Sequence, residues 1–241
     1  MSLSIGEDRR PDGPGQPPPS AQAASPAAKP FWRRPWIIPL WAVTAAFLWL
    51  QAVPFVGTPE AEAPIPAHEG FAAYYPLLLT HIALGTVAMV ACCLQVWPRI
   101  RQRRPKIHRI SGRIYVPATV VSGICAIIII PFAPPVGQIG AFMSTTLWII
   151  TTLVGFWAVR RRKFALHRRF MLYSFALVMN NVWGLTMSKI IFGFGIQIDF
   201  VYLGEAARWV GWTVNLMVVQ WFLYRTMKRP VEVPVGQAAG A

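Results

Sequence analysis

The 241-residue chain has few charged residues, and few of those are acids. Charged side chains make up 13% of it, which is about half of their share in soluble domains. Only 9 acids stand against 23 lysines and arginines, and the formal net charge is +14. A nucleic-acid-binding domain needs such a basic excess on a solvated surface, and a chain that is 55% hydrophobic has too few ionic residues to make one. The composition indicates a polytopic membrane protein with the lipid bilayer as its partner and no nucleic acid.

Other absences narrow the possible chemistry. Three cysteines are too few for a disulfide-rich secreted module. The long apolar runs contain no Asp or Glu, whereas a proton-coupled transporter usually carries an intramembrane carboxylate. Zinc-binding patterns, Gly-rich nucleotide loops and a serine, histidine and acid triad are also missing from the sequence.

Six apolar runs are long enough, at about 20 residues, to cross the roughly 30 Å hydrocarbon layer. They cover residues 36–56, 75–97, 114–132, 139–159, 170–192 and 206–224. Each is predicted to be helical, because lipid cannot satisfy exposed backbone polar groups. The expected fold is all-α, a six-helix transmembrane domain over residues 36–225. A disordered Pro-rich tail is expected at 1–35 and a second tail at 226–241.

The basic residues predict the orientation. If all six runs cross, 21 of the 23 lysines and arginines lie on one side of the membrane, and only Lys189 and Arg208 lie on the other. Five of the nine acids share that second side. The positive-inside rule then places both termini in the cytoplasm, and we expect a multi-pass protein of the cell membrane.

Runs two to five each carry small and polar residues at helical spacing, so that each set occupies one helix face. The four sets are His81, Gly85, Ala88, Cys92 and Gln95; His108, Gly112, Tyr115, Thr119 and Ser122; Gly140, Ser144, Trp148, Thr151 and Gly155; and His167, Met171, Ser174, Asn181 and Ser188. Such faces pack helices closely and form interhelical hydrogen bonds. They predict a four-helix core made of runs two to five, with runs one and six at its periphery.

Three histidines belong to these faces. His81 lies inside run two, where a histidine is costly and is a functional candidate by default. His108 and His167 come just before runs three and five, and each is followed directly by arginine. Since runs three and five cross in the same direction, these two histidines are predicted to lie at the same depth.

Two neutral imidazoles at one depth are a possible axial pair for a haem iron. In that reading His108 and His167 ligate a b-type haem. Arg109, Arg113 and Arg168 lie near its propionates, and His81 is a second-site ligand or a hydrogen-bond partner of a quinone. The protein would then transfer electrons within the membrane, to a quinone or another redox partner.

Two other functions stay open at this point. The same Arg-His clusters could hold the head group of a lipid or isoprenoid phosphate in a membrane-embedded enzyme or binder. The chain could also be a non-catalytic accessory membrane subunit, in which the polar faces only pack helices.

The motif-bearing segments resemble a mainly bacterial integral-membrane family that is known as a conserved domain of unknown function. The resemblance covers about residues 77–184. It rests on His81-Ile-Ala-Leu-Gly85, His108-Arg109-Ile-Ser-Gly112-Arg113-Ile-Tyr115 and His167-Arg168-Arg169-Phe170-Met171. It implies a membrane topology and no activity.

A weaker resemblance is to cytochrome b561-like membrane proteins, whose four core helices carry two bis-histidine b haems. It implies that His108 and His167 are the pair from the second and fourth core helices, and that His81 belongs to the other pair. The partner of His81 is missing, because run four contains no histidine, and Met143 is the only substitute ligand in its outer half.

Overall fold

The computed structural model describes residues 36–65 and 68–226. The tail predicted at 1–35, and all but the first residue of the tail predicted at 226–241, lie outside the described residues. In the described part every regular element is a helix, as predicted. The longer helices are α1 (Ile37–Gln51), α2 (Tyr74–Val96), α4 (Pro105–Ile129), α5 (Gln138–Arg160), α6 (Phe164–Val178), α7 (Asn180–Gly193) and α8 (Phe200–Thr226). The short ones are η2 (Val53–Phe55), η3 (Glu60–Glu62), α3 (Pro98–Arg103) and η4 (Ile130–Phe132).

Four segments of the described chain are long and apolar enough to cross a membrane. They are Ile37–Phe55, Tyr74–Val96, Pro105–Phe132 and Gln138–Arg160, and they match the first four predicted runs. The fifth run forms two helices, α6 and α7, and the sixth lies within the 27-residue helix α8. The count of six crossings therefore stays a prediction.

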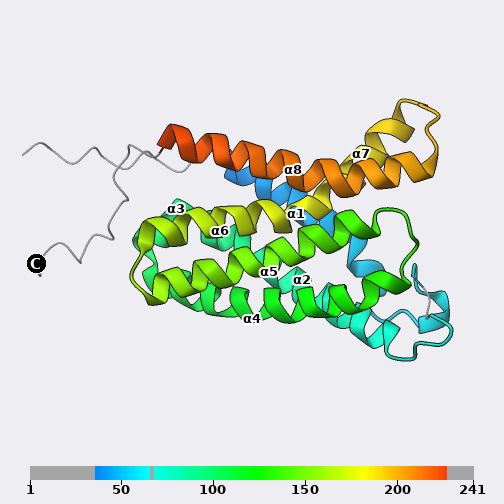
Figure 1. Cartoon of the computed structure of the whole chain (residues 1–241), viewed down its shortest axis with the longest axis horizontal. Coiled ribbons are helices and arrows are strands. Elements are labelled where there is room, and N and C mark those ends of the chain that lie inside the picture. The colour runs from blue at the N-terminus through cyan, green and yellow to red at the C-terminus, as the bar shows by residue number, and fades with distance from the viewer. Residues whose placement is uncertain (1–35, 66–67, 227–241) are drawn as a thin grey trace, which may run out of the picture. The chain divides into compact units, whose positions relative to one another are not determined.

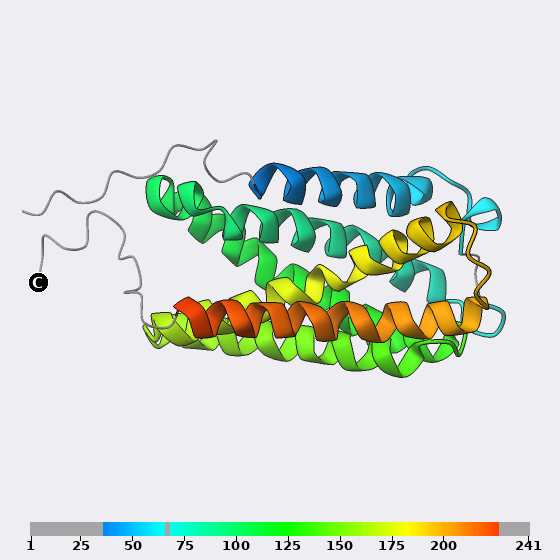
Figure 2. The ribbon, with the colours of Figure 1, turned by 90° about the horizontal axis from the view of Figure 1, so that it is seen from above.

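The fifth run is interrupted at Met179, so the single helix predicted over 170–192 is corrected to two. Asn215 of α8 explains how the break is stabilised. Its Nδ2 donates to the Ala176 carbonyl at 2.9 Å, and its Oδ1 accepts from Trp183 Nε1 at 2.9 Å. Inside a membrane a broken helix needs such partners for the backbone groups that it frees. The α7 helix then runs obliquely to α8 (Figure 2).

The four-helix core consists of α2, α4, α5 and α6, which are the predicted runs two to four and the first half of run five. The second half of run five, α7, was predicted to belong to the core and instead packs mainly on α8. The α2 helix packs along α4, α4 also packs on α5, and α5 packs along α6, which in turn approaches α2. Helices α4 and α6 therefore face each other across one diagonal of the core, and α2 and α5 across the other. Helices α7 and α8 lie side by side outside these four (Figure 1).

The inward faces of the core are the polar faces that the sequence predicts. The following members of the four sets are buried: Ala88, Cys92, Tyr115, Thr119, Ser122, Gly140, Ser144, Trp148, Thr151, Gly155 and Ser174. The fifth run departs from its predicted face beyond Met179, where Asn180 is buried and Asn181 is exposed. The break explains this departure, because it changes the rotation of the second half of the run relative to the first.

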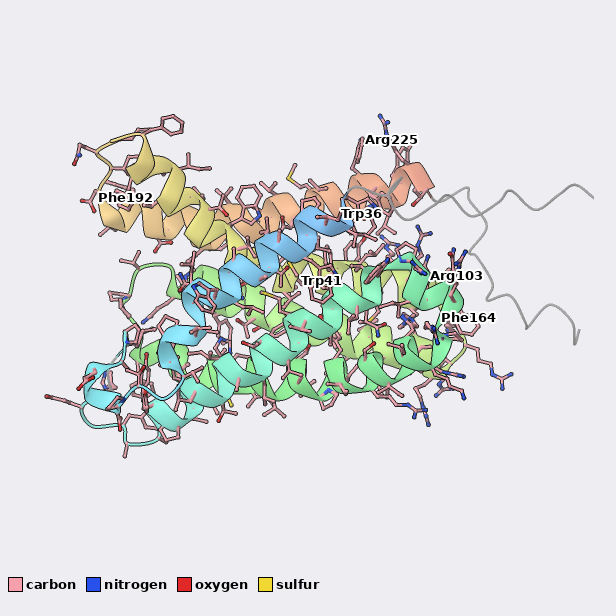
Figure 3. The ribbon with its side chains drawn as sticks, turned by 180° about the vertical axis from the view of Figure 1, so that it is seen from behind. Trp36, Trp41, Arg103, Phe164, Phe192 and Arg225 are labelled. Carbon is pink, nitrogen blue, oxygen red and sulfur yellow. The ribbon has the colours of Figure 1, made fainter. Side chains whose placement is uncertain are left out.

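Most of the described basic residues gather at one end of these helices. Arg103 of α3, Phe164 at the start of α6 and Arg225 at the end of α8 lie together there, and Phe192 lies at the other end (Figure 3). We call the end that contains residues 98–113, 160–169 and 225 the basic end. The described acids lie in the segments before α2 and around the start of α8, which belong to the opposite end: Glu60, Glu62, Glu69, Asp199 and Glu205.

Candidate functional site

A fully buried tyrosine connects three core helices. Tyr115 of α4 is 0% exposed, and its hydroxyl accepts a hydrogen bond from Trp148 Nε1 of α5 at 3.0 Å. The same hydroxyl lies 2.5 Å from Ser174 Oγ of α6, and Ser174 Oγ lies 2.6 Å from Thr152 Oγ1 of α5. The bond between Tyr115 and Ser174 fixes the two diagonal helices against each other near the centre of the core.

His108 and His167 each lie seven residues before one member of this hydrogen-bonded pair. Seven residues are about two helical turns, so each histidine shares a helix face with its partner in the pair. His108 therefore lies on the Tyr115 face of α4, and His167 lies on the Ser174 face of α6, both toward the basic end. The two rings are within electrostatic range of one another. The structure thus places the two histidines that the sequence pairs on facing helices at the same end of the core.

His167 is held in one tautomer. Its Nδ1 lies 2.8 Å from the Gly155 carbonyl of α5, and since a carbonyl only accepts, Nδ1 carries the proton. Burial lowers the pKa of His167 below the ordinary value for histidine, against the opposing effect of the Gly155 carbonyl. The ring is therefore neutral near pH 7, and Nε2 has a lone pair for a ligand. A backbone carbonyl on Nδ1 is the usual way to orient a metal-binding histidine.

The lack of a side chain at Gly155 makes room for Met171 of α6. A Cβ built on Gly155 would lie 2.7 Å from Met171 Sδ of α6. The absence of a side chain lets α5 and α6 approach closely enough for the Gly155 carbonyl to reach His167.

His108 lies inside a helix and not before it, contrary to the prediction. The sequence places it before the third span, but α4 already begins at Pro105, so His108 lies within the first helical turns. Proline favours this start, because its fixed φ suits the first position of a helix and its missing N–H would be unpaired there. His108 Nδ1 is buried and has no hydrogen-bond partner among the described residues. Buried polar atoms are usually hydrogen-bonded, so this nitrogen is an exception that calls for an explanation.

Gln95 at the end of α2 fixes the start of α4. Its Nε2 donates to the His108 carbonyl at 2.6 Å and to Ser111 Oγ at 2.5 Å. The side chain lies next to Gly112, where an added Cβ would be 3.4 Å from Nε2. Gln95 thus positions the backbone that carries His108, a role that its place on the α2 face did not reveal.

The predicted arginines do not gather beside the two rings. Arg109 and Arg113 are exposed on α4. Arg168 turns to α8, where its Nη2 donates to Thr226 Oγ1 at 3.3 Å and its guanidinium lies 6.0 Å from the Phe222 ring centre. The cation that acts on His108 is instead Arg101 of α3. In the sequence it is one of several arginines in a basic run, with nothing to single it out.

His81 lies apart from the other histidines, toward the opposite end. It is 14 residues before Gln95 on the same helix, or about 21 Å along the axis. Its Nδ1 lies 3.0 Å from both the carbonyl and the Oγ of Ser122 on α4, and Ser122 Oγ donates to the His81 carbonyl at 2.9 Å. This reciprocal contact joins α2 to α4.

The diagonal partner of α2 supplies no second ligand at the level of His81. The inward face of α5 there carries Gly140 and Ser144, and Met143, the substitute named from the sequence, is 42% exposed. Arg208 of α8 packs against Gly140 and is within electrostatic range of His81. A nearby cation and a missing partner both argue against a second bis-ligated iron at this end.

The three histidines and the Tyr115 network all fall within residues 78–223, which match the family model described as "Predicted membrane protein (DUF2306)". The match covers more than half of the chain. The chain belongs to this family. Membership establishes a predicted membrane protein of an uncharacterised family, as the resemblance of its motifs implies. No curated protein and no solved structure matches this DUF2306 chain.

Proposed function

We propose that the protein binds one b-type haem between α4 and α6 at the basic end, and that it transfers electrons within the membrane. The observation that carries this proposal is the position of His108 and His167. Both lie two turns from the hydrogen-bonded Tyr115–Ser174 pair, on diagonal helices, and at the same end of the core.

The donor set is of the right kind for such a group. His167 offers Nε2 because its Nδ1 donates to the Gly155 carbonyl, and the buried Nδ1 of His108 has no hydrogen-bond partner among the described residues. A pair of imidazoles with no further ligating side chain is the usual axial set of a membrane b-type cytochrome. When bound, the haem supplies a one-electron redox couple.

The protein's own residues would hold and orient the group. His108 and His167 would hold it, Gly155 and Gln95 would keep their backbones in place, and Arg101 would supply positive charge for the propionates. His81 serves in this proposal to fasten α2 to α4. The electron partner is a quinone in the bilayer or a redox protein at the basic end.

The proposal includes a topology of six crossings, with the basic end in the cytoplasm of a cell-membrane protein. Figure 3 supports it, since Arg103 and Arg225, which the sequence assigns to one side, lie at one end. The positive-inside rule gives that end its orientation.

The test is the visible spectrum of the full chain, expressed with haem precursor and purified in mild detergent. We expect a Soret band, an α band on reduction with dithionite, and about one haem per chain by extraction. The oxidised protein should be low-spin in electron paramagnetic resonance, because two imidazoles would hold the iron. A folded, monodisperse protein without these bands would overturn the proposal.

A further inference from the structure

A second feature at the basic end is a mostly apolar groove between α5, α6 and α8, with a volume of about 760 Å³. Its deeper part is lined by Leu147, Leu177 and Leu216, which lie further from the basic end along their helices. Its part nearest that end is lined by Tyr173, Gln220 and Trp221. The lining therefore changes from aliphatic to polar and aromatic toward the membrane surface, as the chain of a lipid changes toward its head group. We call it the α8 groove.

Two arginines, one on α6 and one on α8, contact residues of the polar part of the α8 groove. Arg169 of α6 donates from Nε to Tyr173 Oη at 3.0 Å, and Tyr173 donates to Gln220 Oε1 at 2.5 Å. The guanidinium of Arg225 on α8 lies 4.4 Å from the Trp221 ring centre. Both arginines are exposed and are held by groove residues. Because Tyr173 engages only Nε, one of five N–H donors in a guanidinium, Arg169 retains donors for an oxyanion.

The charged residues around the α8 groove indicate which kind of molecule binds in it. No acidic side chain lies at the basic end within residues 36–65 and 68–226, since all five acids of that part lie toward the opposite end. A second copy packed here through the same surface would bring arginine against arginine. An acidic phospholipid supplies both a phosphate for the two guanidiniums and an acyl chain for the aliphatic part.

We propose that the α8 groove binds an acidic phospholipid, with its phosphate between Arg169 and Arg225 and one acyl chain along Leu216 and Leu177. This site is separate from the proposed haem site, and the proposal does not depend on haem binding. It assigns a role to the Arg169–Tyr173–Gln220 contacts, which the electron-transfer proposal leaves unused.

The first test compares lipids on the full chain. The purified protein is reconstituted with equal amounts of phosphatidylglycerol and phosphatidylcholine and then analysed by native mass spectrometry. We expect retention of one phosphatidylglycerol per chain in preference to phosphatidylcholine. The double variant Arg169→Gln/Arg225→Gln should lower that preference roughly tenfold, because each basic residue near the surface contributes to the attraction. The control Arg103→Gln/Arg160→Gln removes the same charge at the same end and should keep the preference.

A second pair of variants tests the groove itself. Met217 lines the α8 groove, and its neighbour Val218 does not, although both are exposed on α8. Met217→Trp should fill the groove and reduce retention of phosphatidylglycerol severalfold, whereas Val218→Trp should leave it unchanged. Soluble glycerol 3-phosphate should not displace the lipid, since it has no acyl chain.

Three results would overturn this proposal. The first is equal retention of the two lipids by the wild type. The second is an equal loss in the Arg103/Arg160 control, which would mean unspecific attraction to a basic surface. The third is a lipid-free dimer that dissociates in the Arg169/Arg225 variant, which would make a second copy the occupant. A colourless protein that still retains phosphatidylglycerol would refute the haem site and leave the lipid site standing.

Discussion

The histidines at the two ends of the four-helix core have different surroundings. At the basic end, His108 and His167 come from helices that face each other across the diagonal, and the Tyr115–Ser174 bond aligns their faces. At the opposite end, His81 is fastened to its immediate neighbour α4 through Ser122. A histidine in an apolar segment is thus not a ligand by its location alone. A bis-histidine site would need a second donor on the opposed helix at the same level, and within residues 36–65 and 68–226 the basic end is where two histidines meet this condition.

The largest expected effect separates these two ends directly. His108→Ala and His167→Ala should each lower the haem content of the purified protein by at least tenfold, because each removes one axial ligand. His81→Gln should keep about the wild-type content, since α5 presents no second ligating side chain at the level of His81. Haem extraction and the reduced-minus-oxidised spectrum measure both.

Size-exclusion profiles of the three variants serve as the folding control. Loss of haem in His81→Gln, with retention of haem in His167→Ala, would place the haem site at the end opposite the basic end and would contradict the proposal.

The next effect concerns the close contact of α5 and α6. Gly155→Ala should lower the free energy of unfolding by about 1–3 kcal/mol, because its Cβ collides with Met171 and the core is already filled. Haem affinity should fall as well, since the carbonyl that orients His167 moves. Thermal unfolding of the detergent-solubilised protein, with and without added haem, measures both quantities.

Gly112→Ala is the matched control for this change. Its Cβ would meet the Gln95 amide at 3.4 Å, at the edge of ordinary contact. Its cost should stay below about 1 kcal/mol. Equal costs for the two variants would show that the α5–α6 contact is no tighter than the α2–α4 contact.

A smaller effect is expected at the centre, which both ends share. Tyr115→Phe keeps the ring and removes a hydroxyl that bonds Trp148 and Ser174. Two lost hydrogen bonds inside a membrane protein correspond to about 1–2 kcal/mol of unfolding free energy. Denaturation in mixed detergent micelles checks this value, with Tyr224→Phe, an exposed tyrosine on α8, as the neutral control.

The smallest effect is expected at the opposite end. Ser122→Ala removes the Oγ contacts with His81 but keeps the Ser122 carbonyl for Nδ1. The unfolding free energy should fall by less than about 1 kcal/mol, with no change in haem content. A change in the haem spectrum would mean that the two ends are coupled.

The core was largely predictable because its signals are periodic. Small and polar residues at helical spacing identified the inward faces of α2, α4, α5 and α6, and Tyr115, Trp148 and Ser174 were among them. The pairing of His108 with His167 followed from the direction of the runs. These predictions need only the geometry of one helix and the count of crossings.

The remaining features depend on contacts between distant residues. Neither proline nor glycine marks the break at Met179. It is stabilised by Asn215, 36 residues later. The rotation of α4 determines where the Arg109 and Arg113 side chains point, and Thr226 of α8 determines where Arg168 points. The sequence of the basic segments alone does not predict either. Arg101 acts on His108 because α3 forms a separate short helix that packs on α4.

The joint at Met179 has a consequence for how the protein is made. Helices α6 and α7 have 15 and 14 residues, so each is only about 21–23 Å long, too short to cross the hydrocarbon layer alone. The partner of the Ala176 carbonyl at the joint lies on α8, which follows α7 in the chain. The joint therefore acquires this contact only after α8 has been synthesised, so the packing of the fifth segment depends on a helix that is made after it.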